Sequence, residues 1–200
     1  HHEIGYLTDL ISNRAVQWLC RVSAGDAPFF LSLHYTAPHW PWETRDDAAR
    51  APTIKDDLFD LAAGNIHVYR RMIHHMDEGI GWIMQALRET GQLDNTLVVF
   101  TSDNGGERFS DNWPLVGGKM DLTEGGIRVP WIAHWPAGIA PGGVSDQQCL
   151  TMDWSATTSS GPLTNNPPMP GRPSSGRPSS RPRPSRTRER SNARGVRGKR

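Results

Sequence analysis

The 200-residue chain has a nearly balanced charge, with 22 Lys and Arg against 21 Asp and Glu, but the balance hides an asymmetry. Residues 171–200 contain ten Arg and one Lys against a single acid, a net charge of +10, which leaves −9 for the rest. Two cysteines far apart, Cys20 and Cys149, exclude a disulfide framework and a zinc signature, and we expect both to pack as small apolar side chains. The sequence has no run of about 18 apolar residues and so indicates no membrane span.

The first half of the chain predicts two helices with a strand between them. Residues 6–22 carry apolar side chains at three- and four-residue steps, which is typical of an amphipathic helix. Residues 29–35 are aromatic and aliphatic and indicate a buried strand, followed by a proline-rich loop. Residues 65–91 repeat the helical spacing, and Gly91 is a natural C-terminal stop. Two histidines of this helix are expected at exposed or capping positions: His74 and His75.

The second half begins with a predicted strand over residues 97–101, whose branched and aromatic side chains suit a pleat covered on both faces. A helix, a tight turn and then this strand are typical of half of a βαβ crossover. Another short strand is expected over residues 131–135. From Thr158 onward Ser, Pro, Gly, Asn and Arg dominate, so we expect a disordered tail over 158–200 after an α/β domain over 1–157.

Hard oxygen donors follow the strand over residues 97–101. Asp103 and Asn104 lie just past its C-terminal end, at the edge of an open α/β sheet where ligands bind. A carboxylate beside an amide carbonyl suits Ca²⁺ or Mg²⁺ better than zinc, although Ca²⁺ takes about six to eight oxygens. Together with Gly105 and Gly106, the same residues also suit a plain turn, so the residues alone leave both interpretations open.

Other side chains are candidates for binding an anion. Lys119 follows two glycines, which would let it approach a phosphate or sulfate oxygen closely, or it is simply a solvated loop residue. His39 lies in the loop after the first predicted strand. Its imidazole could bind an oxyanion or protonate a leaving oxygen, or only hydrogen bond within the loop. Glu124 and Arg128 are four residues apart and favour a structural ion pair.

Three segments resemble the sulfatase family of the alkaline-phosphatase-like superfamily, over residues 5–157. They read PFFLSLHYTAPHWP, then VYRRMIHHMDEGIGWIMQALRETGQLDNTLVVFTSDNGG, then GGKMDLTEGGIRVPWIAHWPAGI. The resemblance implies an α/β fold with a mainly parallel sheet flanked by helices, and residues 1–157 would be part of a sulfatase catalytic domain. It also implies hydrolysis of sulfate monoesters, and we expect a sheet edge and the metal site to be left open.

The resemblance also implies roles for single residues. Asp103 and Asn104 would ligate Ca²⁺, with Mg²⁺ possible, while Lys119 and His39 would face the sulfate. The family's nucleophile is a formylglycine made from the Cys of a Cys-x-Pro-Ser-x-Arg motif. No such motif occurs in this sequence, since Cys20 begins Cys-Arg-Val-Ser and lacks both the Pro and the Arg. We therefore expect the isolated chain to be inactive.

The resemblance leaves several alternatives open. The substrate would be a sulfated small molecule or glycan, in a protein that is secreted, periplasmic or lysosomal. A phosphodiesterase or phosphonate hydrolase of the same superfamily is the alternative enzyme, and an inactive module that only binds a cation is the non-enzymatic one. The basic tail could bind nucleic acid by counterion release, but we favour a shifted reading frame or a misjoined end as the origin of the abrupt change at Thr158.

Overall fold

The computed structural model describes residues 3–56 and 64–154. The chain divides into two compact units: His1–Cys149 and Leu150–Arg200. Of the second unit only residues 150–154 are described, and they include one helical turn. The tail expected to be disordered, residues 158–200, lies outside the described residues, as does its predicted boundary.

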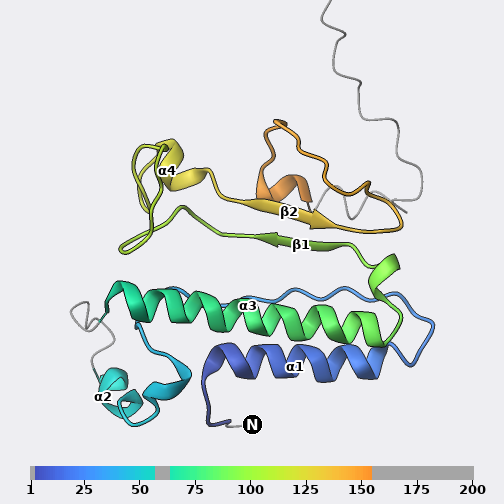
Figure 1. Cartoon of the computed structure of the whole chain (residues 1–200), viewed down its shortest axis with the longest axis horizontal. Helices are drawn as coiled ribbons and strands as arrows, with labels where there is room; N and C mark the ends of the chain where they lie inside the picture. Colours follow the sequence, from blue (N-terminus) through green and yellow to red (C-terminus); the bar gives the residue numbers. More distant parts are fainter. Residues whose placement is uncertain (1–2, 57–63, 155–200) are drawn as a thin grey trace, which may run out of the picture. The chain divides into compact units, whose positions relative to one another are not determined.

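Two long helices form the base of the first unit. Helix α1 (Leu7–Val22) and helix α3 (Ile66–Glu89) run side by side in the same direction (Figure 1). Their apolar faces meet because buried residues recur at helical spacing. The central cluster between them consists of Ala15, Leu19, Ile83, Ala86 and Leu87. The two helices expected from the sequence are confirmed.

The ends of α3 follow from local chemistry. The side-chain oxygen of Asn65 accepts hydrogen bonds from the backbone N–H groups two and three residues on, at 2.9 and 3.1 Å. At the other end Gly91 has a φ of +71°, and the Gln92 N–H donates to the Leu87 carbonyl at 2.8 Å. This is the left-handed stop that glycine provides most readily, so the prediction for Gly91 is confirmed.

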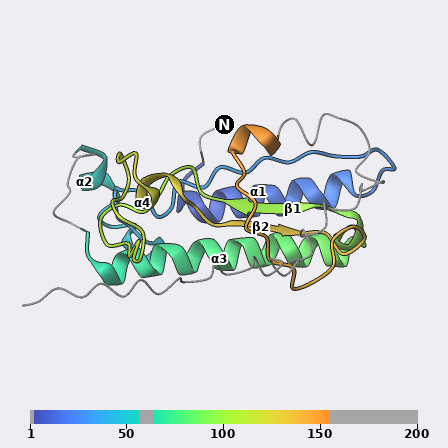
Figure 2. The ribbon, with the colours of Figure 1, turned by 90° about the horizontal axis from the view of Figure 1, so that it is seen from above.

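Strands β1 (Val98–Thr101) and β2 (Trp131–His134) form a two-stranded sheet that lies over the two helices (Figure 2). Their pairing is antiparallel, with Val98 opposite His134. The mixed helix-and-sheet class agrees with the prediction, but the described pair is not parallel. No crossover helix of sufficient length joins β1 to β2. The expectation of cover on both faces is also wrong, since Phe100 is 37% exposed.

The segment over residues 29–35 is extended, but it is not a strand in the described structure. Its side chains alternate in burial, and Leu31, Leu33 and Tyr35 pack against the helical core. The segment was expected to be a buried strand, but it is only half-buried, and Phe30 is 72% exposed. A strand also needs a hydrogen-bonded neighbour, and the described residues provide none for this segment.

Short helical elements complete the described chain. They are η1 (Arg45–Asp47), α2 (Ala51–Asp56), η2 (Leu93–Asn95) and α4 (Glu124–Ile127). Both cysteines are exposed, so the expectation that they are packed is wrong. Cys20 directly follows the buried Leu19 and so falls on the outward side of α1, while Cys149 lies in irregular chain. Within residues 3–56 and 64–154, no helix is long and apolar enough to cross a membrane.

His75 is buried, with only 4% of its surface exposed, so its predicted exposed position is wrong. It falls on the same stripe of α3 as Met72 and Gly79, which are three and four residues away. Its ring lies edge-on to Tyr6, with 5.6 Å between centroids, and its Nδ1 has no hydrogen-bond partner among the described residues. Burial lowers the pKa of His75, and the nearby charge of Arg45 lowers it further.

We expect His75 to make the fold sensitive to acid. In the unfolded chain His75 binds a proton near its ordinary pKa of about 6.5. In the folded chain its pKa is lower, so protonation favours the unfolded state. The free energy of unfolding should therefore fall as the pH drops below about 6.5. Urea unfolding across this range should show a weaker pH dependence in His75→Phe, while His74→Gln, at the exposed neighbour, should keep it. Equal pH dependence in the wild type and His75→Phe would contradict the assignment.

Candidate anion-binding site

An aromatic cluster joins the two loops that carry the candidate site residues. Trp42, only 3% exposed, meets the Phe109 ring edge-on with 5.0 Å between centroids. Tyr69 of α3 lies 6.3 Å from the same ring. Burial raises the pKa of Tyr69, opposed by a hydrogen bond with the Ser110 side chain, so Tyr69 stays a neutral phenol. The loop containing His39 is thereby held against the loop that follows β1.

Phe109 reaches this cluster from a tight turn. The Ser110 N–H donates to the Glu107 carbonyl at 3.1 Å, and Phe109 itself has a φ of +71°. A bulky residue in the left-handed region costs energy, and it persists only where surrounding contacts hold it. Packing against Trp42 and Tyr69 supplies those contacts. The turn is therefore an anchored part of the site.

His39 and Lys119, 80 residues apart in sequence, are brought into hydrogen-bond contact. The Lys119 Nζ lies 2.9 Å from His39 Nε2, and His39 Nδ1 lies 2.6 Å from the Trp40 carbonyl oxygen. A carbonyl oxygen can only accept, so Nδ1 carries the proton. An ammonium can only donate, so Nε2 presents its lone pair to Lys119. In this arrangement His39 is an acceptor that orients the ammonium.

Glu107 is a second acceptor for Lys119, and it is not among the residues predicted for the site. Its Oε2 lies 3.0 Å from Nζ, and the side chains are 42% exposed for Glu107 and 22% for Lys119. Among the described residues the ammonium thus has two hydrogen-bond acceptors, which leaves one of its three N–H groups for an anion. The only signal in the sequence is an acid three residues after Asn104.

Backbone contacts at glycines tie the loop between β1 and α4 to itself and to α4. The Lys119 N–H donates to the Gly106 carbonyl at 3.0 Å, and the Gly105 N–H to the Gly126 carbonyl at 2.8 Å. The Gly125 N–H donates to the Val116 carbonyl, also at 2.8 Å. Such close approach needs residues without a Cβ: one added at Gly105 would strike the Gly125 carbonyl oxygen.

Asn112 closes this junction with its side chain. Its Nδ2 donates to the carbonyls of Gly106 at 3.0 Å and Gly117 at 3.1 Å. Its Oδ1 accepts from the Gly106 N–H at 3.2 Å. One amide group thus links the segment after Asp103 and Asn104 to the glycine pair before Lys119. Asn112 is a positioning residue that was likewise not predicted from the sequence.

Asp103 and Asn104 lie just past β1, as predicted, with Asp103 exposed and Asn104 half-buried. The Ser102 hydroxyl donates to the Asn104 carbonyl at 3.0 Å, which shapes a local turn. Their carboxylate and amide oxygens suit a hard cation, but Ca²⁺ requires about six to eight oxygens. The part of the chain that the structure describes contains no group of three or more His, Cys, Asp or Glu able to hold a metal. The chemistry of these two oxygen donors therefore fits Ca²⁺, but two donors are too few to form a complete Ca²⁺ site.

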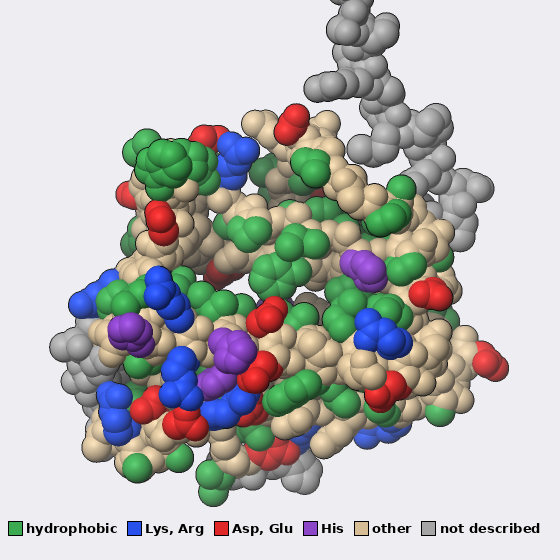
Figure 3. All heavy atoms as spheres, viewed as in Figure 1, with side chains coloured by type: hydrophobic (Ala, Val, Ile, Leu, Met, Phe, Trp, Pro, Cys, Tyr) green, Lys and Arg blue, Asp and Glu red, His purple; other side chains and the backbone are tan. Residues whose placement is uncertain are grey.

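The predicted pair of Glu124 and Arg128 is present, with 3.3 Å between Oε1 and the guanidinium. Both side chains are about two-thirds exposed. An exposed pair at this spacing contributes about 0–1 kcal/mol, so it steadies α4 only slightly. Figure 3 shows apolar side chains gathered on the surface around α4. In the loop between β1 and α4, the most exposed large apolar residues are Trp113, Val116, Met120 and Leu122.

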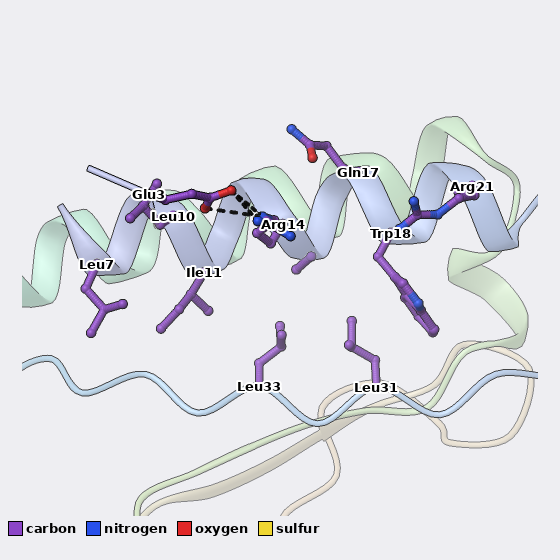
Figure 4. A pocket seen from close by; sticks show the side chains of 11 residues that line it. Glu3, Leu7, Leu10, Ile11, Arg14, Gln17, Trp18, Arg21, Leu31 and Leu33 are labelled. Carbon is purple, nitrogen blue, oxygen red and sulfur yellow. Dashed lines mark hydrogen bonds and ion pairs between the residues drawn. The ribbon is translucent and has the colours of Figure 1, made fainter. Parts of the chain in front are cut away.

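A groove of about 650 Å³ lies elsewhere, between α1 and the extended segment over residues 29–35. Figure 4 shows Leu31 and Leu33 pointing toward the α1 face that carries Ile11 and Trp18. Its lining is mainly apolar and contains none of the candidate site residues. The chemistry is therefore expected at Lys119 and not in this groove.

The sulfatase family profile matches residues 2–160. The chain belongs to the sulfatase family. This sulfatase-family chain is 31% identical over 157 residues to the uncharacterized sulfatase YdeN of Escherichia coli K12, covering 76% of the chain and 27% of YdeN. It is 34% identical over 160 residues to mouse N-acetylgalactosamine-6-sulfatase, covering 77% of the chain and 28% of the mouse protein.

A solved structure supports the same assignment. The crystal structure of Ps i-CgsB in complex with k-i-k-neocarrahexaose is 37% identical, with a TM-score of 0.60 over 70% of this chain and 30% of that one. The sulfatase-family chain therefore shares the alkaline-phosphatase-like fold of these neighbours. It spans less than a third of the length of each of these relatives.

Proposed function

We propose that this chain provides the anion-binding part, and two ligands of the cation site, of an enzyme that hydrolyses sulfate monoesters. The observation that carries the proposal is the contact of Lys119 with His39 at 2.9 Å, made by loops 80 residues apart. An ammonium oriented by a fixed acceptor can stabilise negative charge on a sulfate oxygen. Membership of the sulfatase family supports a sulfate ester as the substrate.

The substrate class we propose is a sulfated glycan. One relative is named for N-acetylgalactosamine 6-sulfate, and one structural neighbour was solved with a neocarrahexaose. Both names refer to sugars, which favours a glycan over a small aryl sulfate.

The proposed roles divide between the residues by their chemistry. Lys119 binds a sulfate oxygen, and His39 fixes the direction of the ammonium through Nε2. Asp103 and Asn104 supply two of the oxygen ligands of a Ca²⁺ ion, which would polarise the sulfate when bound. The nucleophile we propose is a formylglycine, whose Cys-x-Pro-Ser-x-Arg motif does not occur in this sequence.

Replacing Asp103 by alanine should weaken Ca²⁺ binding by roughly tenfold or more, since even residues behind a metal ligand can cost about that much. The measurement is calorimetric titration of the whole chain with Ca²⁺. Asp26→Ala is the matched control, because Asp26 is an exposed aspartate in the turn after α1. No Ca²⁺ binding, or equal binding by the two variants, would count against a cation site at Asp103.

The proposal also predicts that this chain by itself releases no sulfate from 4-nitrocatechol sulfate. The residues described can bind and orient an ester, but the group that attacks the sulfur is not among them. Sulfate release above the uncatalysed rate, with and without Ca²⁺, is the quantity to measure. Turnover that is lost in Lys119→Met would show that a nucleophile is present after all.

A further inference from the structure

Lys119 carries a built-in counter-ion. The Glu107 carboxylate lies 3.0 Å from the ammonium that we propose binds the substrate anion. The sulfatase-type role of Lys119 does not require this acid. An anion that reaches Lys119 therefore meets one positive and one negative charge from this pair.

The position of Glu107 is set by the fold. Its carbonyl accepts from the Ser110 N–H in the anchored turn, and the residue before it, Gly106, is held by Asn112. Two residues later Phe109 packs against Trp42. The carboxylate is thus attached to a backbone fixed on both sides.

A fixed negative charge discriminates between ligands by their charge. Repulsion from Glu107 doubles when the ligand charge doubles, at equal distance. A sulfate monoester carries one negative charge, whereas a phosphate monoester carries about −1.5 to −2 near pH 7. The repulsion energy between two unit charges about 4 Å apart in water is large enough to change a binding affinity by roughly fivefold.

We propose that Glu107 is a specificity-determining residue that favours monoanionic esters over dianionic ones at Lys119. The proposal rests on the proposed anion-binding role of Lys119. It gives the site a physical means of preferring sulfate monoesters to phosphate monoesters of the same shape. A sulfate monoester and a phosphodiester each carry one negative charge, so Glu107 repels both equally and does not discriminate between them.

The test is a titration of the whole chain with phenyl sulfate and with phenyl phosphate, followed by the NMR signals of the His39 ring. In Glu107→Gln, affinity for phenyl phosphate should rise about fivefold more than affinity for phenyl sulfate. Glu124→Gln is the matched control, because Glu124 is an exposed acid near the same loop that pairs with Arg128. This control should leave the ratio of the two affinities unchanged.

The outcomes separate this proposal from the one on which it rests. The role of Glu107 alone is overturned by two results together. The first is binding of phenyl sulfate that is lost in Lys119→Met, and the second is a change in affinity by the same factor for both ligands in Glu107→Gln. Absence of binding by either ligand, in the wild type and in Glu107→Gln, overturns the anion site itself. A selective gain for phenyl phosphate supports both.

Discussion

Replacing Gly125 by alanine is expected to lower the free energy of unfolding by about 1–3 kcal/mol. A Cβ at this position would strike the Gly117 carbonyl oxygen and lie 2.6 Å from that of Val116. Both are backbone atoms, so no side-chain rotation relieves the overlap. The hydrogen bonds between α4 and the loop that precedes it would have to lengthen. Urea denaturation of the whole chain measures the change.

Gly81→Ala is the matched control for this substitution. Gly81 is exposed on α3, and a Cβ there meets no atom within 4 Å. In a helix interior alanine is favoured over glycine by roughly 0.5–1 kcal/mol, so this variant should be slightly more stable. A Gly125→Ala chain as stable as the wild type would contradict the close packing of α4 against the loop that precedes it.

Replacing Phe109 by alanine is expected to lower the free energy of unfolding by about 2 kcal/mol. Truncating a fully buried Phe costs about 3–5 kcal/mol, and Phe109 is half-buried. The larger consequence is for the site, because Phe109 joins the loop of Trp42 to the turn of Glu107. Without this ring, nuclear Overhauser contacts between the side chains of His39 and Lys119 should be lost.

Phe30→Ala provides the control for the loss of a phenyl ring. Phe30 is 72% exposed, so its truncation should change the free energy of unfolding by less than about 0.5 kcal/mol. The contacts between His39 and Lys119 should persist in this variant. If they also persist in Phe109→Ala, the aromatic cluster does not position the site.

The helices, and the position of Asp103 and Asn104 just past β1, could be predicted because both depend on local pattern. Helical spacing identified α1 and α3, and glycine chemistry identified the stop at Gly91. The burial of His75 was also within reach, since it shares a stripe with Met72 and Gly79. His75 was predicted to be exposed or capping, but its position on the helix decides its burial.

Other features depend on contacts between distant segments and left no local signal. Residues 29–35 alternate like a strand, but strand formation depends on a neighbour that the described chain does not supply. Glu107 pairs with Lys119 from a turn in which Phe109 is left-handed, a conformation that nothing in the sequence of that turn favours. The contact between His39 and Lys119 similarly depends on the packing of Trp42 against Phe109.

The most direct test of the account is whether Lys119 binds a sulfate ester. Titration of the whole chain with phenyl sulfate should shift the His39 ring signals in a saturable way, because His39 accepts a hydrogen bond from the ammonium that receives the anion. In Lys119→Met, with an unchanged free energy of unfolding, these shifts should disappear. Equal shifts in the wild type and Lys119→Met, or none in the wild type, would contradict the account.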